Sequence, residues 1–168
     1  GRMAWRQGAL AEARACYEES LTLSRNASDA RTINLALNGL GMVSLVENDS
    51  GAAHACFEEA LTLARDLREG HLIGNCLNSL AFLAWDRGDL TQARVHWEDA
   101  LAEARVLGNP FSVAAGMANL TEVALRRGAW GEVRGNFMIW LEGGRVEDGS
   151  MHGCLYGVVQ KYRMDGFP

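Results

Sequence analysis

Asparagine side chains recur along the chain at positions that suit them to ligand binding. Asn38 and Asn78 lie forty residues apart, and Asn119 is shifted by one residue from the next equivalent position. Each amide offers both a donor and an acceptor, which suits the backbone of an extended peptide or the hydroxyls of a sugar. The same amides could instead be solvated or cap nearby turns. We take as candidate ligand- or partner-binding residues those amides and the neighbours that helix packing does not require: Asn38, Met42, Asn75, Asn78, Phe82, Asn119, Glu122 and Arg126.

Residues of the kinds that catalyse reactions or hold metals are scattered. The histidines show no pair four residues apart and no adjacent acid suited to a metal: His54, His71, His96 and His152. Six acidic residues form a ladder on one set of expected helices, which is far more often a solvated face than an acid–base pair: Glu18, Glu19, Glu58, Glu59, Glu98 and Asp99. The sequence has no phosphate-binding glycine motif and no nucleophile elbow. We therefore expect no enzyme activity, no cofactor and no metal site.

Composition and charge narrow the class of protein further. The net charge of −5 disfavours a nucleic-acid-binding surface, which needs clustered Lys and Arg. The sequence contains no apolar run of the roughly 20 residues that a membrane helix requires. The four cysteines lack C-x-x-C and zinc spacing, and reduced thiols that serve helix packing are the simplest interpretation: Cys16, Cys56, Cys76 and Cys154. These features favour a cytoplasmic protein without direct contact to nucleic acid or membrane.

The elements that position the asparagines come from a forty-residue repeat. Residues 13–25, 53–65, 93–105 and 133–145 align without insertions. The same place in these segments is always aromatic, filled by Tyr17, Phe57, Trp97 and Phe137. A period of this length is the signature of a solenoid, in which each unit buries its apolar face against its neighbours.

Each repeat is expected to contain two helices. Ala53, Phe57, Ala60, Leu61 and Ala64 form one apolar stripe of an amphipathic second helix. The segments that begin at Leu35, Asn75 and Ala115 align as the first helices. In these helices the small residues Gly41, Ala81 and Thr121 would let the second helix of the unit approach closely. The pattern and its caps predict helices over about 9–25, 30–46, 51–66, 71–87 and 90–106, with another from 110.

The first residues are expected to lie inside a repeat. Trp5 matches Leu45, Trp85 and Leu125, which precede turns, and Gly8 matches the turn residues Asn48, Gly88 and Gly128. Residues 1–7 should therefore be the last turns of a helix that ends at Gly8. This placement suggests a fragment of a longer protein, although Met3 could also mark a true start.

The repeat resembles the tetratricopeptide repeat. Leu40, Gly41, Ala53, Phe57 and Ala60 reproduce its leucine, glycine, alanine, aromatic and alanine pattern. The next copy is formed by Leu80, Ala81, Ala93, Trp97 and Ala100, and a weaker third copy has Leu120, Phe137 and Leu141, with Val133 and Trp140 replacing alanines. The match covers residues 1–142. It implies an all-α, right-handed superhelical solenoid of antiparallel helix hairpins whose inner wall is built from the first helices, which carry the candidate binding residues.

The forty-residue unit departs from the common 34-residue form and has Arg65 and Arg105 near the place of its proline. In this it resembles the repeats of bacterial multidomain transcriptional regulators of the LuxR-like, maltose-activator-like and AfsR-like kinds, which follow a nucleotide-hydrolysing domain. After a Gly-rich break at 143–150, residues 151–168 are expected to form a capping helix and tail. Their apolar stripe consists of Met151, Leu155, Val158, Val159 and Tyr162, and Leu155, Gly157 and Arg163 resemble the closing helix of those regulators.

Two functions follow from the resemblance. The chain could be the sensor and interaction region of such a regulator, binding a protein, a peptide or a small effector on its inner wall. Alternatively it could be a free-standing scaffold or adaptor that joins partner proteins. The basic residues of the family's carboxylate clamp are absent, so a terminal carboxylate is not expected as the ligand. Self-association is expected through the apolar surface around Trp5 and Leu10.

Overall fold

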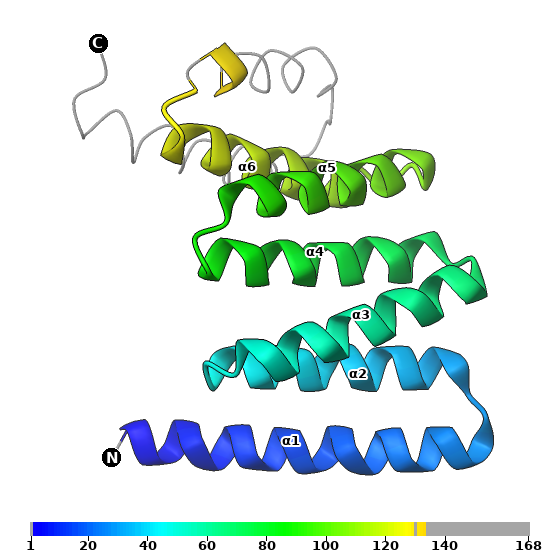
Figure 1. The fold of residues 1–168 in the computed structure, drawn as a ribbon. Helices are drawn as coiled ribbons and strands as arrows, with labels where there is room; N and C mark the ends of the chain where they lie inside the picture. The colour runs from blue at the N-terminus through cyan, green and yellow to red at the C-terminus, as the bar shows by residue number, and fades with distance from the viewer. Residues whose placement is uncertain (1, 130, 134–168) are drawn as a thin grey trace. The chain divides into compact units, whose positions relative to one another are not determined.

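The structure, a computed structural model, describes residues 2–129 and 131–133 of the chain. Over these residues the secondary structure is entirely helical, as predicted. The helices are α1 (Arg2–Ala27), α2 (Ala30–Val46), α3 (Ser50–Leu67), α4 (Gly70–Asp86), α5 (Leu90–Val106) and α6 (Pro110–Arg126) (Figure 1). The predicted Gly-rich break at 143–150 and the capping helix at 151–168 lie outside the described residues.

The chain divides into two compact units, residues 1–103 and 104–168, and each is described by itself. In the first unit, α2 packs against both α1 and α3, and α3 packs against α4. The two first helices of consecutive repeats, α2 and α4, also contact each other directly. Pairing of each helix with its sequence neighbour is the arrangement expected of a tetratricopeptide-like array.

The apolar stripe of α3 forms the centre of the first unit's core. Its five predicted residues, Ala53, Phe57, Ala60, Leu61 and Ala64, are all buried. They pack with side chains of α2 and α4, namely Leu37, Leu72, Cys76, Leu77, Leu80 and Leu83. Three residues of the stripe are alanines, and their short side chains let the neighbouring helices approach α3 closely.

Side-chain caps begin several of the described helices. Asp49 accepts a hydrogen bond from the backbone N–H of Ala52 at 2.9 Å, and Asn109 accepts one from Ser112 at 3.1 Å beside Pro110. Equivalent caps use Asp29 for α2 and Asp89 for α5. Each cap satisfies a backbone donor that has no partner inside its helix, and it thereby fixes the first residue of that helix.

The predicted turn at Gly8 is wrong. α1 is one unbroken helix from Arg2 to Ala27 and passes through Gly8 (Figure 1). At the true turns Asn48 and Gly88 have positive φ angles of 64° and 76°, and an aspartate follows each of them to cap the next helix. Continuing the helix keeps its backbone hydrogen bonds at a cost of about 1 kcal/mol for one interior glycine.

None of the helices in the described part of the chain is long and apolar enough to cross a membrane.

Candidate functional site

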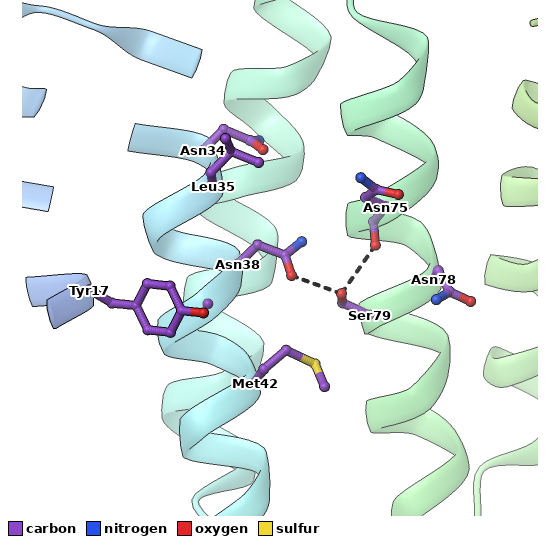
Figure 2. Close-up of a pocket in the computed structure, with 9 residues that line it drawn as sticks. Tyr17, Asn34, Leu35, Asn38, Met42, Asn75, Asn78 and Ser79 are labelled. Carbon is purple, nitrogen blue, oxygen red and sulfur yellow. Dashed lines mark hydrogen bonds between the residues drawn. The ribbon is translucent and has the colours of Figure 1, made fainter. Parts of the chain in front are cut away.

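An open pocket of about 360 Å³ lies in the first unit, over α2 and α4. Its lining comes from three helices and consists of Tyr17, Asn34, Leu35, Asn38, Gly39, Met42, Asn75, Asn78 and Ser79 (Figure 2). Amides, a hydroxyl and apolar side chains are present, and no lining residue is charged. The volume lies at the lower end of the range for small-ligand sites, about 300–1,000 Å³.

Four of the eight candidate binding residues line this pocket together: Asn38, Met42, Asn75 and Asn78. Phe82 lies on α4 one turn beyond Asn78 and is outside the lining, but its side chain is 40% exposed. The other three candidates, Asn119, Glu122 and Arg126, belong to α6 in the second unit. There Glu122 and Arg126 form an ion pair with an N–O distance of 3.9 Å along the helix.

Asn38 joins α2 to α4. Its Oδ1 accepts a hydrogen bond from Ser79 Oγ at 3.0 Å, and its Nδ2 donates to Cys76 Sγ at 3.6 Å. The Ser79 hydroxyl also lies 3.1 Å from the backbone carbonyl of Asn75, one turn earlier in α4 (Figure 2). Burial raises the pKa of the Cys76 thiol, which keeps it protonated and unreactive. Asn38 therefore has a structural role at the base of the pocket, which the sequence pattern did not predict.

Asn78 occupies the equivalent place one repeat later but has a different partner. Its Oδ1 accepts a hydrogen bond from the indole Nε1 of Trp97 at 2.9 Å. Figure 2 shows its side chain pointing away from Asn38. The difference follows from the aromatic in each hairpin, because the phenyl ring of Phe57 has no donor and the indole of Trp97 has one. The two amides therefore do not form a uniform row.

Asn75 is the lining amide with the greatest freedom to bind a ligand. Its side chain is exposed, and within the described residues its amide group makes no hydrogen bond. An exposed amide at a pocket rim can form a donor and acceptor pair with a peptide group without breaking an existing contact.

Five lining residues were not among the candidates: Tyr17, Asn34, Leu35, Gly39 and Ser79. Asn34 is buried in α2, and its Nδ2 donates to the backbone carbonyl of Ala60 in α3 and to Cys76 Sγ. Its repeat equivalents are Gly74 and Ala114, so the repeat alignment gives no signal for a polar residue there.

Tyr17 was assigned to packing because it holds the repeat's aromatic place. Its side chain is 39% exposed, whereas the equivalent Phe57 and Trp97 are 0% and 2% exposed. The Tyr17 ring lies against Gly39 of α2 and forms one wall of the pocket. A tyrosine in place of phenylalanine or tryptophan was the available signal, since its hydroxyl favours a partly solvated position.

The chemistry of the pocket suits binding rather than catalysis. Among the described residues there is no cluster of three or more His, Cys, Asp or Glu side chains that could hold a metal ion. The lining contains no carboxylate or imidazole to act as a general base toward the Ser79 hydroxyl, whose hydrogen-bond acceptors are amide and backbone oxygens.

Comparison with known proteins supports the repeat type. The family model of the tetratricopeptide repeat matches residues 1–30 and 74–110. The crystal structure of BtubC (BKLC) from P. vanneervenii is similar in fold, with a TM-score of 0.75 and 22% sequence identity over 94% of this chain and 68% of that chain. No curated protein matches the sequence significantly. The chain thus has an all-α, tetratricopeptide-like fold of consecutively paired helices, and the repeat's family model matches part of its length.

Proposed function

We propose that this chain is a non-catalytic interaction module that binds an extended segment of a partner protein in the pocket over α2 and α4. The observation that carries the proposal is the lining of the open 360 Å³ pocket, which combines uncharged amides with apolar side chains and has no charged group. Amides such as that of Asn75 complement peptide groups, and Leu35 and Met42 offer apolar contact. The same lining disfavours a terminal carboxylate, which would lose water without gaining a cation.

We further propose that the module is the sensor region of a bacterial multidomain transcriptional regulator and works in the cytoplasm. The support is the resemblance of its forty-residue unit to the repeats of those regulators. In that setting, a bound partner would be reported to a nucleotide-hydrolysing domain and a DNA-binding domain on the same polypeptide. A free-standing scaffold would use the same pocket, and the sequence of the full-length gene product distinguishes the two settings directly.

A peptide-display selection tests the binding proposal. Random peptides of about 12 residues, long enough to cross the two contacting helices, are selected on the immobilised chain. The enriched peptides are then measured against Met42→Lys, which introduces a charge into the uncharged pocket. Leu23→Lys is the matched control, because Leu23 is 61% exposed on α1 and does not line the pocket.

We expect the selected peptides to lose at least about tenfold in affinity for Met42→Lys and to keep their affinity for Leu23→Lys. Peptides that bind Met42→Lys as tightly as the parent would place the binding surface elsewhere. A selection that enriches no peptide over repeated rounds would refute the peptide-binding function.

A further inference from the structure

Two large apolar side chains are exposed at equivalent places in consecutive repeats. Met42 on α2 and Phe82 on α4 lie forty residues apart, and each is 40% exposed. We call these two residues the apolar pair. Both lie on the helices that carry the pocket, and Met42 is part of its lining. Exposed apolar side chains at matching places on contacting helices offer a ligand two points of contact rather than one.

The ring of Phe82 is held in place by an internal network. It meets the indole of Trp97 edge to face, with the ring centroids 5.4 Å apart and the planes at 90°. Trp97 is itself 2% exposed and donates its Nε1–H to Asn78. Asn78 therefore holds the indole of Trp97, and Trp97 in turn holds the exposed ring of Phe82. Asn78 is in this sense a positioning residue for Phe82.

Met42 is the adaptable member of the apolar pair. Its side chain extends from α2 toward α4 beside the Asn38–Ser79 hydrogen bond (Figure 2). Thioether side chains adjust to ligands of different shape, whereas a ring fixed by aromatic contacts does not. A ligand would thus meet one fixed and one adjustable apolar contact.

The spacing of α2 and α4 limits the conformation of a segment that spans the apolar pair. Helices in direct contact, as these two are, have axes about 8–10 Å apart. A polyproline II segment returns to the same face every three residues and rises about 3.1 Å per residue, which gives about 9 Å. A β-strand returns to the same face after two or four residues, about 6.6 or 13 Å. The polyproline II spacing fits the helix separation and the strand spacings do not.

The polar part of the lining agrees with such a ligand. A polyproline II backbone has no internal hydrogen bonds, so its peptide groups need outside partners. The exposed amide of Asn75 lies on α4 among the lining residues and can supply both a donor and an acceptor. The uncharged lining favours a segment that carries no charge over this stretch.

We infer that the α2–α4 surface binds an uncharged segment in polyproline II conformation, with two apolar residues three positions apart. One apolar side chain contacts Met42 and the other contacts Phe82, while Asn75, about two turns before Phe82 on α4, can bind the backbone of the segment beyond the apolar pair. This inference rests on the proposed function and adds to it the conformation and the sequence pattern of the ligand.

Fluorescein-labelled peptides test the spacing. The host sequence consists of Pro, Gln and Ser, and it carries a single leucine or two leucines separated by one, two or three residues. Anisotropy titrations should show the peptide with two intervening residues binding at least about fivefold tighter than each of the others. Phe82→Ser should remove this advantage and leave binding of the single-leucine peptide unchanged. Leu23→Ser, the exposed control on α1, should change neither.

Trp97→Phe tests the positioning role of Asn78, because it keeps an aromatic ring and removes the indole donor. We expect Trp97→Phe to reduce the preference for the peptide with two intervening residues, while binding of the single-leucine peptide persists. Circular dichroism at the titration temperature checks that the variant is folded. Phe82→Ser changes a partly exposed residue and keeps the test decisive if Trp97→Phe unfolds.

The outcomes separate this inference from the proposed function. If the spacings bind equally, or if one or three intervening residues bind best, the inference is refuted while the display selection still supports peptide binding at the pocket. It is equally refuted if displayed peptides bind in a Met42-dependent way but lack an apolar pair three residues apart. If neither the displayed nor the synthetic peptides bind, the proposed function fails and the inference fails with it.

Discussion

Gly41→Ala should destabilise the chain by overpacking its core. A Cβ atom at Gly41 would lie 2.4, 2.6 and 2.9 Å from the Cε1, Cδ1 and Cζ atoms of the Phe57 ring. Phe57 is fully buried and packs within the core of α2, α3 and α4. The ring cannot move away without displacing other core side chains, so the added methyl group forces a shift of the helix or of the ring.

The same substitution at Gly39 is a matched control on the same helix. A Cβ there would lie 2.4 Å from Cε1 of Tyr17, which is as close as the contact at Gly41. Tyr17 is 39% exposed, so its ring can turn toward solvent. The two variants therefore share the change in helix propensity and the initial overlap, and they differ in whether the opposing ring can move.

The expected free energies follow from these contacts. Overpacking a close-packed core costs about 1–3 kcal/mol. Replacing an interior helical glycine with alanine stabilises by about 0.8–1 kcal/mol. Gly41→Ala should therefore lower the free energy of unfolding by about 0–2 kcal/mol, whereas Gly39→Ala should raise it by about 0.8–1 kcal/mol.

Urea unfolding followed by circular dichroism measures both variants under the same conditions. The Gly41→Ala midpoint should lie below that of Gly39→Ala by the equivalent of about 1–3 kcal/mol, with similar slopes. Equal midpoints would refute the argument, because they would mean that the buried ring yields as easily as the exposed one. Gly39→Ala should also alter peptide affinity, since Tyr17 lines the pocket.

Three further predictions concern a cap, a strained residue and a half-buried histidine. Asp49→Ala removes the hydrogen bond to the Ala52 N–H and should cost about 1 kcal/mol in urea unfolding. Arg68 ends α3 with a φ angle of 55°, where Gly108 stands one repeat later, so Arg68→Gly should stabilise by about 0.5–1 kcal/mol in the same assay. Burial lowers the pKa of His96, whose Nδ1 is buried without a partner among the described residues. The unfolded chain then takes up the proton first, so stability should decline as the pH falls below about 6.5 through the folded-state pKa. Unfolding free energies at pH 7.5 and 5.5 should therefore differ more for the parent than for His96→Asn.

The helices were predictable because their signals are local. The stripe of α3 needs only the spacing of its own residues, and the caps at Asp49 and Asn109 act on N–H groups three residues away. The error at Gly8 has the same origin. Its place in the repeat suggested a turn, but a single glycine does not end a helix whose backbone hydrogen bonds continue on both sides of it.

The candidate site was only partly predictable because it depends on contacts between helices. Asn38, Met42, Asn75 and Asn78 share a pocket, and the repeat register was sufficient to place them on one face. The repeat pattern gave no signal for Asn34, and for Tyr17 it gave only the exchange of a phenylalanine or tryptophan for a tyrosine. The burial of the first and the exposure of the second depend on which neighbouring helix faces them, a property that an alignment of repeats does not contain.

The contrast between Asn38 and Asn78 shows how a repeated backbone can support a site that is not repeated. The two asparagines occupy the same place on α2 and α4, yet one bonds the next first helix through Ser79 and the other bonds the indole of its own hairpin. The difference arises from exchanging Phe57 for Trp97 and from the serine at the place of Gly39. Both exchanges also affect the exposed surface, because Trp97 contacts Phe82 and Gly39 contacts Tyr17. Buried differences between repeats thus determine which side chains a ligand meets, so second-helix aromatics are as informative about specificity as the exposed residues themselves.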